Sequence, residues 1–210
     1  MNPISLTFGS HKSDVNLLGK SAGEFHDKNH LKTVYESWIN VIQSSLHQLE
    51  KQYNLLVAEG AGSPVELNLK EYDVANMKMA EIADIPVLLV ADINKGGVFA
   101  SITGTLALLE PEETERVKGI IINKFHGDKA QFQDGIELIE QKTQLPVLGV
   151  LPYMEHNIEE ENDAVLLATD ANVNASSLPA DEEIYHLAQQ MKQHLDWNRI
   201  LEIAGQWYKR

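Results

Sequence analysis

The chain has 210 residues, 43% of them hydrophobic, which is enough for one domain with a substantial core. Its 17 basic and 31 acidic residues give a formal charge of −14, which argues against a nucleic-acid partner because such partners require clustered Lys and Arg. The chain contains no cysteine, which excludes disulfides, thiolate metal centres and a Cys nucleophile.

The first strong periodic pattern is helical. Residues Leu31–Tyr53 carry apolar side chains, among them Trp38 and Ile42, at steps of three and four residues. This spacing places them on one stripe of a helix, which predicts a helix packed against a sheet. Shorter stripes of the same kind occupy Val74–Ala83, Val98–Leu109 and Phe132–Thr143.

Four short runs, one after each of these stripes, are continuously apolar, as is typical of strands buried on both faces of a parallel sheet. They are Asn54–Glu59, Pro86–Asp92, Val117–Asn123 and Pro146–Leu151. Strands that alternate with helices at these lengths form βαβ units. The sequence therefore predicts an α/β fold with a mostly parallel, doubly wound sheet flanked by helices.

The tail has a different composition. Residues Thr169–Pro179 are small, polar and turn-forming, which indicates a linker or long loop. After it, Asp181 and Asp196 can each cap a short amphipathic helix. We therefore expect an α/β domain over residues 1–168, a linker over 169–179 and C-terminal helices over 180–210.

The ends of the predicted strands carry the candidate site, because ligands of open parallel sheets bind beyond the carboxyl ends of the strands. Glu59 ends the first apolar run and is followed by Gly60 and Gly62. A carboxylate beside glycine amides suits Mg²⁺ next to phosphates or a substrate carboxylate. The alternative is a tight turn with Glu59 pointing to solvent.

A second candidate group follows the next strand. Asp92 can bind a metal, while Lys95 and the amides of Gly96 and Gly97, at the start of a helix, attract anionic oxygens. The alternative is an ordinary βα turn with a solvated lysine.

The third and fourth strands end in candidate nucleotide contacts. The Asn123 amide offers the donor and acceptor that the edge of adenine requires, Phe125 can close such a pocket, and backbone groups near Pro152 can line it. The alternative for Asn123 is the commoner role of capping a loop.

Two other patterns carry no site. Gly19-Lys20-Ser21 is similar to the end of a phosphate-binding loop, but the pattern G-x-x-x-x-G-K-[ST] would need glycine where Asp14 stands. The eight histidines form no H-E-x-x-H zinc-hydrolase motif, and a solvated loop residue is the expected role of His126, which follows the third strand.

Four long segments of this sequence resemble cobyric acid synthase, the glutamine-dependent ligase that amidates corrin carboxylates in cobalamin biosynthesis. They are VAEGAGSPVELNL (57–69), DVANMKMAEIADIPVLLVADINKGGVFASITGTLALL (73–109), VKGIIINKFHGD (117–128) and PVLGVLPY (146–153). The resemblance extends over roughly residues 1–167, and motifs of this length are far more specific than short patterns.

The resemblance implies a synthetase domain of the dethiobiotin-synthase-like P-loop superfamily. In that family ATP and Mg²⁺ activate a carboxylate as an acyl phosphate, which ammonia attacks. Carried over, Glu59 and Asp92 would organise metal and Lys95 would contact phosphates or substrate. Asn123 would read adenine, and a corrinoid carboxylate would be the substrate.

Two departures limit this transfer. The family's phosphate-binding loop lies upstream of the segment that Met1–Leu6 resembles, so we expect this chain to lack it. The family's glutaminase domain uses a Cys nucleophile, so we expect a glutaminase or another ammonia source to be supplied elsewhere.

A dethiobiotin-synthase-like enzyme for a smaller substrate and a degenerate, non-catalytic nucleotide-binding module therefore stay open as alternatives. No signal peptide or run of roughly 18 apolar residues stands in the sequence, so we expect a cytoplasmic protein without a membrane partner. Whether it forms a homo-oligomer is left open.

Overall fold

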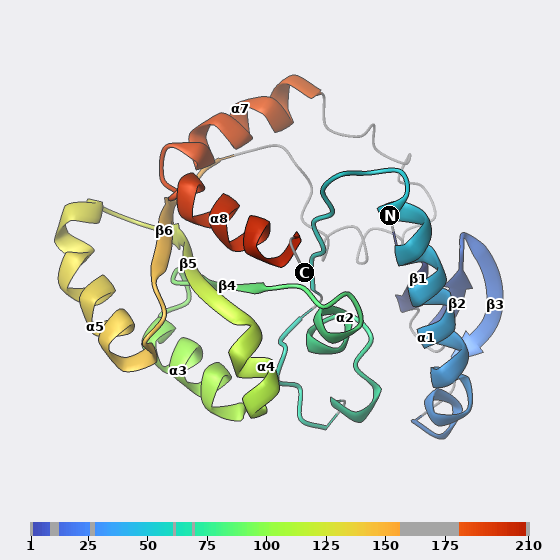
Figure 1. The fold of residues 1–210 in the computed structure, drawn as a ribbon. Coiled ribbons are helices and arrows are strands. Elements are labelled where there is room, and N and C mark those ends of the chain that lie inside the picture. Colours follow the sequence, from blue (N-terminus) through green and yellow to red (C-terminus); the bar gives the residue numbers. More distant parts are fainter. Residues whose placement is uncertain are drawn as a thin grey trace. The chain divides into compact units, whose positions relative to one another are not determined.

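The computed structural model describes residues 2–8, 13–25, 28–60, 62–68, 70–155 and 181–208. These residues divide into two compact units, with the division after Ala83 (Figure 1). The predicted linker Thr169–Pro179 lies outside the described residues. None of the described helices is long and apolar enough to cross a membrane.

The second unit contains a three-stranded parallel sheet in the order β4-β5-β6. Its strands are β4 (Val87–Asp92), β5 (Val117–Phe125) and β6 (Val147–Pro152). All three were predicted, and β5 extends two residues past its predicted end at Asn123. The apolar runs of β5 and β6 become largely buried strands, in which Ile120 and Ile122 are 0% exposed. Strand β4 is only part-buried, and its Val90 is 56% exposed, so the expected burial on both faces does not hold for this strand.

Helices cover both faces of this sheet. Alternate residues of β5 face opposite sides: Ile120 and Ile122 join a cluster with helices α3 and α5, whereas Ile121 joins a cluster with the C-terminal helices. The helices are α3 (Val98–Leu108), α5 (Gln133–Thr143), α7 (Asp181–Lys192) and α8 (Trp197–Tyr208) (Figure 1). The predicted α/β class with a parallel, doubly wound sheet is confirmed.

The bounds of these helices lie close to the predictions. Asp196 caps α8 as expected, since the backbone N–H of Arg199 donates to its Oδ1 at 3.0 Å. A short 3-10 turn, η2 (Lys129–Phe132), precedes α5. A further short helix, α4 (Pro111–Arg116), was not predicted; it begins with a capping box in which the Glu110 N–H donates to Glu113 Oε2 at 2.8 Å.

The first unit combines the predicted long helix with a small sheet that was not predicted. Helix α1 (Lys28–Glu50) buries Trp38, 3% exposed, in a cluster with Val15 of the sheet. The sheet is antiparallel in the order β1-β2-β3. Its strands are β1 (Ile4–Phe8), β2 (Ser13–Leu17) and β3 (Lys20–Phe25).

Gly19 lies in the two-residue turn between β2 and β3. Leu18 and Gly19 have φ angles of 51° and 76°, and Leu17 pairs with Lys20 across the turn. Positive φ at both central residues is the geometry of a tight hairpin turn. The inference that Gly19-Lys20-Ser21 is not a phosphate-binding loop is confirmed, since such a loop joins a strand to a helix.

The predicted strand Asn54–Glu59 is wrong. These residues form exposed coil, with Val57 88% and Leu55 64% exposed, and they pair with no strand in the described part of the chain. A short apolar run becomes a strand only where a neighbouring strand accepts its backbone hydrogen bonds.

The predicted helix Val74–Ala83 is shorter than expected. Helix α2 spans Met77–Ile82, and a 3-10 turn, η1 (Lys70–Tyr72), lies upstream of it. The Asp73 carboxylate accepts backbone N–H groups just before α2 and so holds residues 74–76 in a turn.

Candidate functional site at the carboxyl edge of the parallel sheet

The parallel sheet brings together three of the predicted site residues at its carboxyl edge. Asp92 ends β4 and stands opposite Asn123 on β5, and Pro152 ends β6 opposite Phe125. Two backbone hydrogen bonds close this edge: the Ile93 N–H donates to the Asn123 carbonyl at 3.0 Å, and the Tyr153 N–H donates to the Phe125 carbonyl at 2.8 Å. The positions of the side chains at this edge are therefore set by the paired strands and not by flexible loops.

The two oxygens of the Asp92 carboxylate differ in their surroundings. Oδ1 accepts the Asn94 N–H at 2.8 Å, while Oδ2 lies 3.8 Å from the Lys124 ammonium nitrogen. The Asp92 and Lys124 side chains are each 34% exposed. The carboxylate is therefore anchored on one side and reachable from solvent on the other.

This arrangement fits a magnesium ion that is coordinated partly by Asp92 and partly by the phosphate oxygens of a nucleotide. Mg²⁺ keeps several waters and binds through one or two carboxylates plus phosphate oxygens. Among the described residues there is no group of three or more His, Asp or Glu side chains placed to hold a metal. The Asp92 carboxylate, with one oxygen reachable from solvent, is of the kind that could hold Mg²⁺ together with phosphate oxygens.

The loop after Asp92 leaves room for an anionic ligand. Gly96 and Gly97 have φ angles of 76° and 72°, which side chains rarely adopt, and a Cβ on either would meet open space. Gly97 is the N-cap of the 11-residue helix α3, and Lys95 is exposed beside it. Open backbone, a helix N-terminus and an ammonium group together favour phosphate oxygens.

Asn123 is half-buried, and its side chain is locally anchored. Its Oδ1 accepts the Lys124 N–H at 2.9 Å. An amide oxygen has a second lone pair and the NH₂ group has two donors. The side chain can therefore still offer a donor and an acceptor to the edge of a base.

Phe125 was expected to close a pocket at the rim of this edge, but other aromatic side chains are exposed there. The Phe125 ring packs against Phe132 at 5.1 Å and against the core cluster beneath the edge. The exposed rings are those of His126 and Tyr153, which stack at 4.8 Å with an interplanar angle of 22°. The Tyr153 N–H bond to the Phe125 carbonyl fixes this pair beside β5.

Lys124 is the residue at this edge that the sequence did not single out. Its ammonium group is the nearest cation to Asp92 for which the structure gives a distance, and its backbone φ is 60°. The signal available in the sequence was its position directly after Asn123 at a strand end.

Glu59, Gly60 and Gly62 belong to the other unit. Glu59 is exposed in coil, the Asn76 side chain fills the space where a Cβ of Gly60 would lie, and Gly62 has a φ of 64°. The glycines are therefore required by packing and backbone conformation, and the expectation that Glu59 ends a strand is wrong. Its role as a metal ligand stays a prediction.

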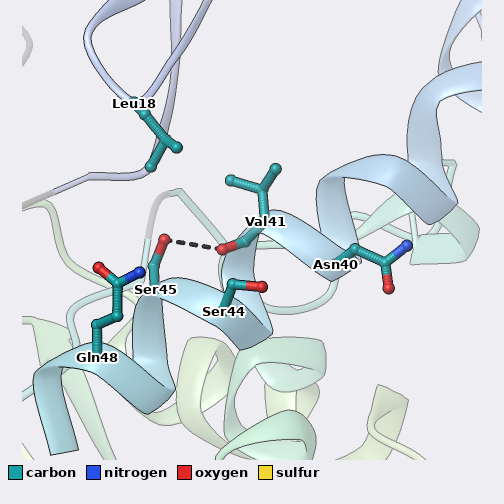
Figure 2. A pocket seen from close by; sticks show the side chains of 6 residues that line it. All are labelled: Leu18, Asn40, Val41, Ser44, Ser45 and Gln48. Atoms are coloured by element: carbon teal, nitrogen blue, oxygen red, sulfur yellow. Dashed lines mark hydrogen bonds between the residues drawn. The ribbon is translucent and has the colours of Figure 1, made fainter. Parts of the chain in front are cut away.

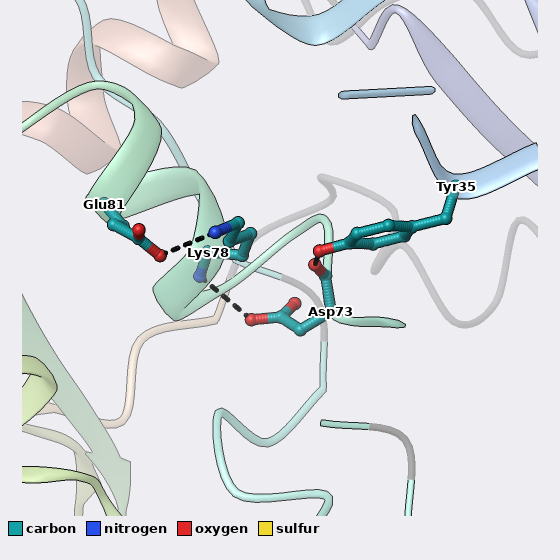
Figure 3. Close-up of polar contacts among 4 residues, drawn as sticks. All are labelled: Tyr35, Asp73, Lys78 and Glu81. Atoms are coloured by element: carbon teal, nitrogen blue, oxygen red, sulfur yellow. Dashed lines mark hydrogen bonds and ion pairs between the residues drawn. The ribbon is translucent and has the colours of Figure 1, made fainter. Parts of the chain in front are cut away.

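A polar cluster in the same unit has a structural role. Asp73 Oδ1 accepts the N–H groups of Ala75 and Asn76, each at 2.9 Å, and Oδ2 accepts the N–H of Lys78 at 3.1 Å. The Tyr35 hydroxyl donates to the Asp73 carbonyl at 3.3 Å (Figure 3). The Asp73 carboxylate is thus engaged in holding the entry to α2.

Two ionisable groups of this cluster have shifted pKa values. Burial raises the pKa of the Tyr35 phenol. The hydrogen bond to Glu81, whose carboxylate lies 2.8 Å from the Lys78 ammonium nitrogen, raises the pKa of Lys78. Both shifts favour the protonated groups that the cluster uses.

A hollow of about 280 Å³ also lies along α1 (Figure 2). It is lined by Leu18, Asn40, Val41, Ser44, Ser45 and Gln48. None of these side chains is ionisable, and Ser45 already donates to the Val41 carbonyl at 2.8 Å. The lining offers no acid, base or charge for catalysis.

The comparisons with known proteins concern the segment that contains the carboxyl edge. Residues 26–161 match the model of a family described as AAA domain. The chain belongs to this AAA domain family. The matched range includes the strand ends at Asp92, Asn123 and Pro152, so the family likeness and the candidate site coincide.

Curated relatives confirm the resemblance to cobyric acid synthase. The chain is 46% identical to the cobyric acid synthase of Desulforamulus reducens over 182 residues, which are 84% of this chain and 35% of that protein. It is 49% identical to that of Yersinia enterocolitica (79% of this chain, 32% of that protein) and 47% identical to that of Photorhabdus laumondii (89% and 36%). The chain spans about a third of the length of these relatives. No solved structure matches it.

Proposed function

We propose that this chain is the nucleotide-binding part of a cobyric acid synthase, which uses ATP to activate corrin side-chain carboxylates for amidation in cobalamin biosynthesis. The observation that carries the proposal is the meeting of Asp92, the Lys95–Gly97 loop and Asn123 at one sheet edge, inside the segment shared with the AAA domain family. Nucleotide binding is implied by that family and by the cobyric acid synthase relatives.

The residues of the edge divide the work of holding Mg²⁺–ATP. Asp92 would bind the metal through Oδ2, because Oδ1 is held by the Asn94 N–H. The start of α3 and the Lys95 ammonium would hold phosphoryl oxygens, and Asn123 would read the adenine edge. Glu59, which belongs to the first unit and not to this edge, is proposed separately as a metal-binding or substrate-organising carboxylate.

When bound, Mg²⁺–ATP would supply the phosphoryl group that converts a poorly electrophilic carboxylate into an acyl phosphate open to attack by ammonia. The chain's contribution is positive charge and fixed amide groups around the transferring group. Because the chain has no cysteine, ammonia would come from a glutaminase domain or from another source outside this sequence. A corrinoid carboxylate is the proposed substrate.

Titration calorimetry of the full chain with ATP, with and without Mg²⁺, tests this proposal. In Asp92→Asn we expect Mg²⁺-dependent affinity to fall about tenfold, roughly 1.4 kcal/mol, because the metal loses a charged ligand. Affinity measured without Mg²⁺ should change little.

Glu115→Gln is the matched control. Glu115 is exposed on α4, directly before the amino end of β5, so this variant removes one charge at the opposite edge of the same sheet. If both variants lost the same Mg²⁺-dependent affinity for ATP, the effect of Asp92→Asn would be due to net charge and not to a lost metal ligand. If the unchanged chain bound no Mg²⁺–ATP, the enzyme proposal would be untenable for this chain, and a non-catalytic module would remain.

A further inference from the structure

Lys124 has an uncommon backbone conformation for a lysine. Its φ of 60° lies in the left-handed region, which non-glycine residues seldom adopt because the Cβ then comes close to the backbone. The register between β5 and β6 shifts in the same place, between Ile122 and Phe125. Irregular pairing of this kind re-aims side chains, and strained residues cluster at functional sites.

The surroundings hold Lys124 in this conformation. Its N–H donates to Asn123 Oδ1 at 2.9 Å. On one side the Asn123 carbonyl is bonded to the Ile93 N–H, and on the other the Phe125 carbonyl is bonded to the Tyr153 N–H. The residue is thus fixed between two closed strand ends, and the strain persists because neighbouring bonds maintain it.

The consequence is an ion pair across two strands. The Lys124 ammonium nitrogen lies 3.8 Å from Asp92 Oδ2, the oxygen that the Asn94 N–H does not engage. With each side chain 34% exposed, the pair is a weak one that water and ions can reach. A divalent cation bound to Oδ2 would meet the ammonium group as a like charge and displace it.

We propose that Lys124 is a positioning residue whose ammonium group holds Asp92 Oδ2 until a divalent cation takes that oxygen, and then moves to the phosphoryl oxygens of the nucleotide. This inference rests on the proposed function. A lysine suits the task because its ammonium is a compact charge on a flexible stem, so the group can move while the backbone stays fixed.

The proposal predicts opposite signs for two affinities. In Lys124→Met, the affinity for Mn²⁺ alone should rise about two- to fivefold, the size of an exposed ion pair, because the competing cation is gone. The affinity for Mg²⁺–ATP should fall about tenfold, because a phosphate contact is lost. Electron paramagnetic resonance of free Mn²⁺ measures the first, and calorimetry measures the second.

Two further variants separate charge from backbone. Lys124→Gly removes the ammonium but adopts a positive φ without strain, so it should reproduce both changes while keeping or raising the thermal midpoint. Lys124→Arg should recover most of the Mg²⁺–ATP affinity. Lys142→Met is the charge control, since Lys142 lies in the last turn of α5, which leads to the amino end of β6.

Each outcome decides the proposal. Opposite changes in Lys124→Met, absent in Lys142→Met, support it. Weakening of both affinities, or no change in either, would show that the ion pair has only a structural role and would overturn it, while the proposed function would stand if Asp92→Asn still loses Mg²⁺–ATP. Failure of the unchanged chain to bind Mn²⁺ alone would overturn the exchange proposed for Lys124, whereas the role of Asp92 as a metal ligand is decided separately by Asp92→Asn with Mg²⁺–ATP.

Discussion

At the scale of single residues, the carboxyl edge depends on polar side chains that the backbone holds in place. The Asn94 N–H holds one oxygen of Asp92, and the Lys124 N–H holds the amide oxygen of Asn123. Such anchoring limits the side-chain freedom that ligand binding would otherwise have to remove. The polar side chains of the edge are therefore largely fixed in place by the backbone alone.

The cluster around Tyr35 predicts how stability depends on pH. Burial raises the pKa of Tyr35 above its usual 10.0, and the Glu81 carboxylate raises that of Lys78 above 10.5. The folded state then binds more protons than the unfolded chain above about pH 10, so these contributions are complete below that pH and are lost as pH rises further.

Urea denaturation at about pH 9 and about pH 11 measures this loss. We expect the free energy of unfolding to decrease between these values, and to decrease less in Tyr35→Phe, which has no ionisable phenol. A decrease of the same size in Tyr35→Phe would show that Tyr35 does not contribute to it.

The sequence predicted the residues of this edge better than their contacts. Asp92 and Asn123 were predicted because parallel strands expose polar residues at their carboxyl ends. The Asp92–Lys124 pair was not predicted, because it depends on a positive φ and a register shift that the order of residues does not reveal. Glu59 was assigned to a strand end that the structure does not contain.

At the scale of elements, side-chain caps determine where several helices begin. Helix α2 starts at Met77, later than its apolar stripe indicated, because Asp73 accepts the N–H groups of residues 75, 76 and 78. Helix α8 starts after Asp196, where the stripe and the cap agreed. A competing hydrogen-bond acceptor thus overrides hydrophobic periodicity.

Removal of the Asp73 carboxylate should destabilise the entry to α2. We expect Asp73→Ala to lower the free energy of unfolding by about 1–2 kcal/mol, as the loss of a helix cap does. Asp73→Asn should lower it less, because the amide oxygen can still accept some of these hydrogen bonds. Urea denaturation followed by circular dichroism measures the change. Glu71→Ala, at an exposed position in η1, is the control and should shift it by no more than about 0.5 kcal/mol.

Strands were predicted well where the apolar pattern was continuous and partners were present. Segments β4, β5 and β6 meet both conditions. Asn54–Glu59 has a continuous apolar pattern but no pairing partner among the described residues. Strands β1, β2 and β3 have partners but lack the pattern, because they are short and partly polar. A strand requires both a suitable sequence and a neighbour, and the neighbour is not a local property.

At the scale of the whole molecule, the stability of the second unit depends on a sheet buried from both sides. Ile122 at 0% exposure and Ile102 of α3 at 1% lie in the cluster on one face. Leu148 and Ile203 of α8 lie in the cluster on the other. Both faces must be covered because the central residues of β5 and β6 are apolar on both sides.

This burial predicts which truncations the second unit tolerates. Ile122→Ala should cost about 2–5 kcal/mol, because it leaves a cavity in a close-packed cluster. Val90→Ala on β4 should cost less than about 1 kcal/mol, because Val90 is 56% exposed. Urea denaturation compares the two, and similar losses would contradict the placement of Ile122 at the centre of this core.

The sequence by itself determined the α/β class, the three parallel strands with helices α3 and α5 between them, and the likeness to cobyric acid synthase. These features are local, since apolar runs, periodic stripes and long motifs can be recognised without knowing what each segment contacts. Only the tertiary structure decided that Asn54–Glu59 stays unpaired, that an antiparallel sheet packs on α1, and that Lys124 meets Asp92. Strand pairing and side-chain approach depend on residues distant in the sequence, so hydrogen-bond geometry and packing select among alternatives that local patterns leave equal.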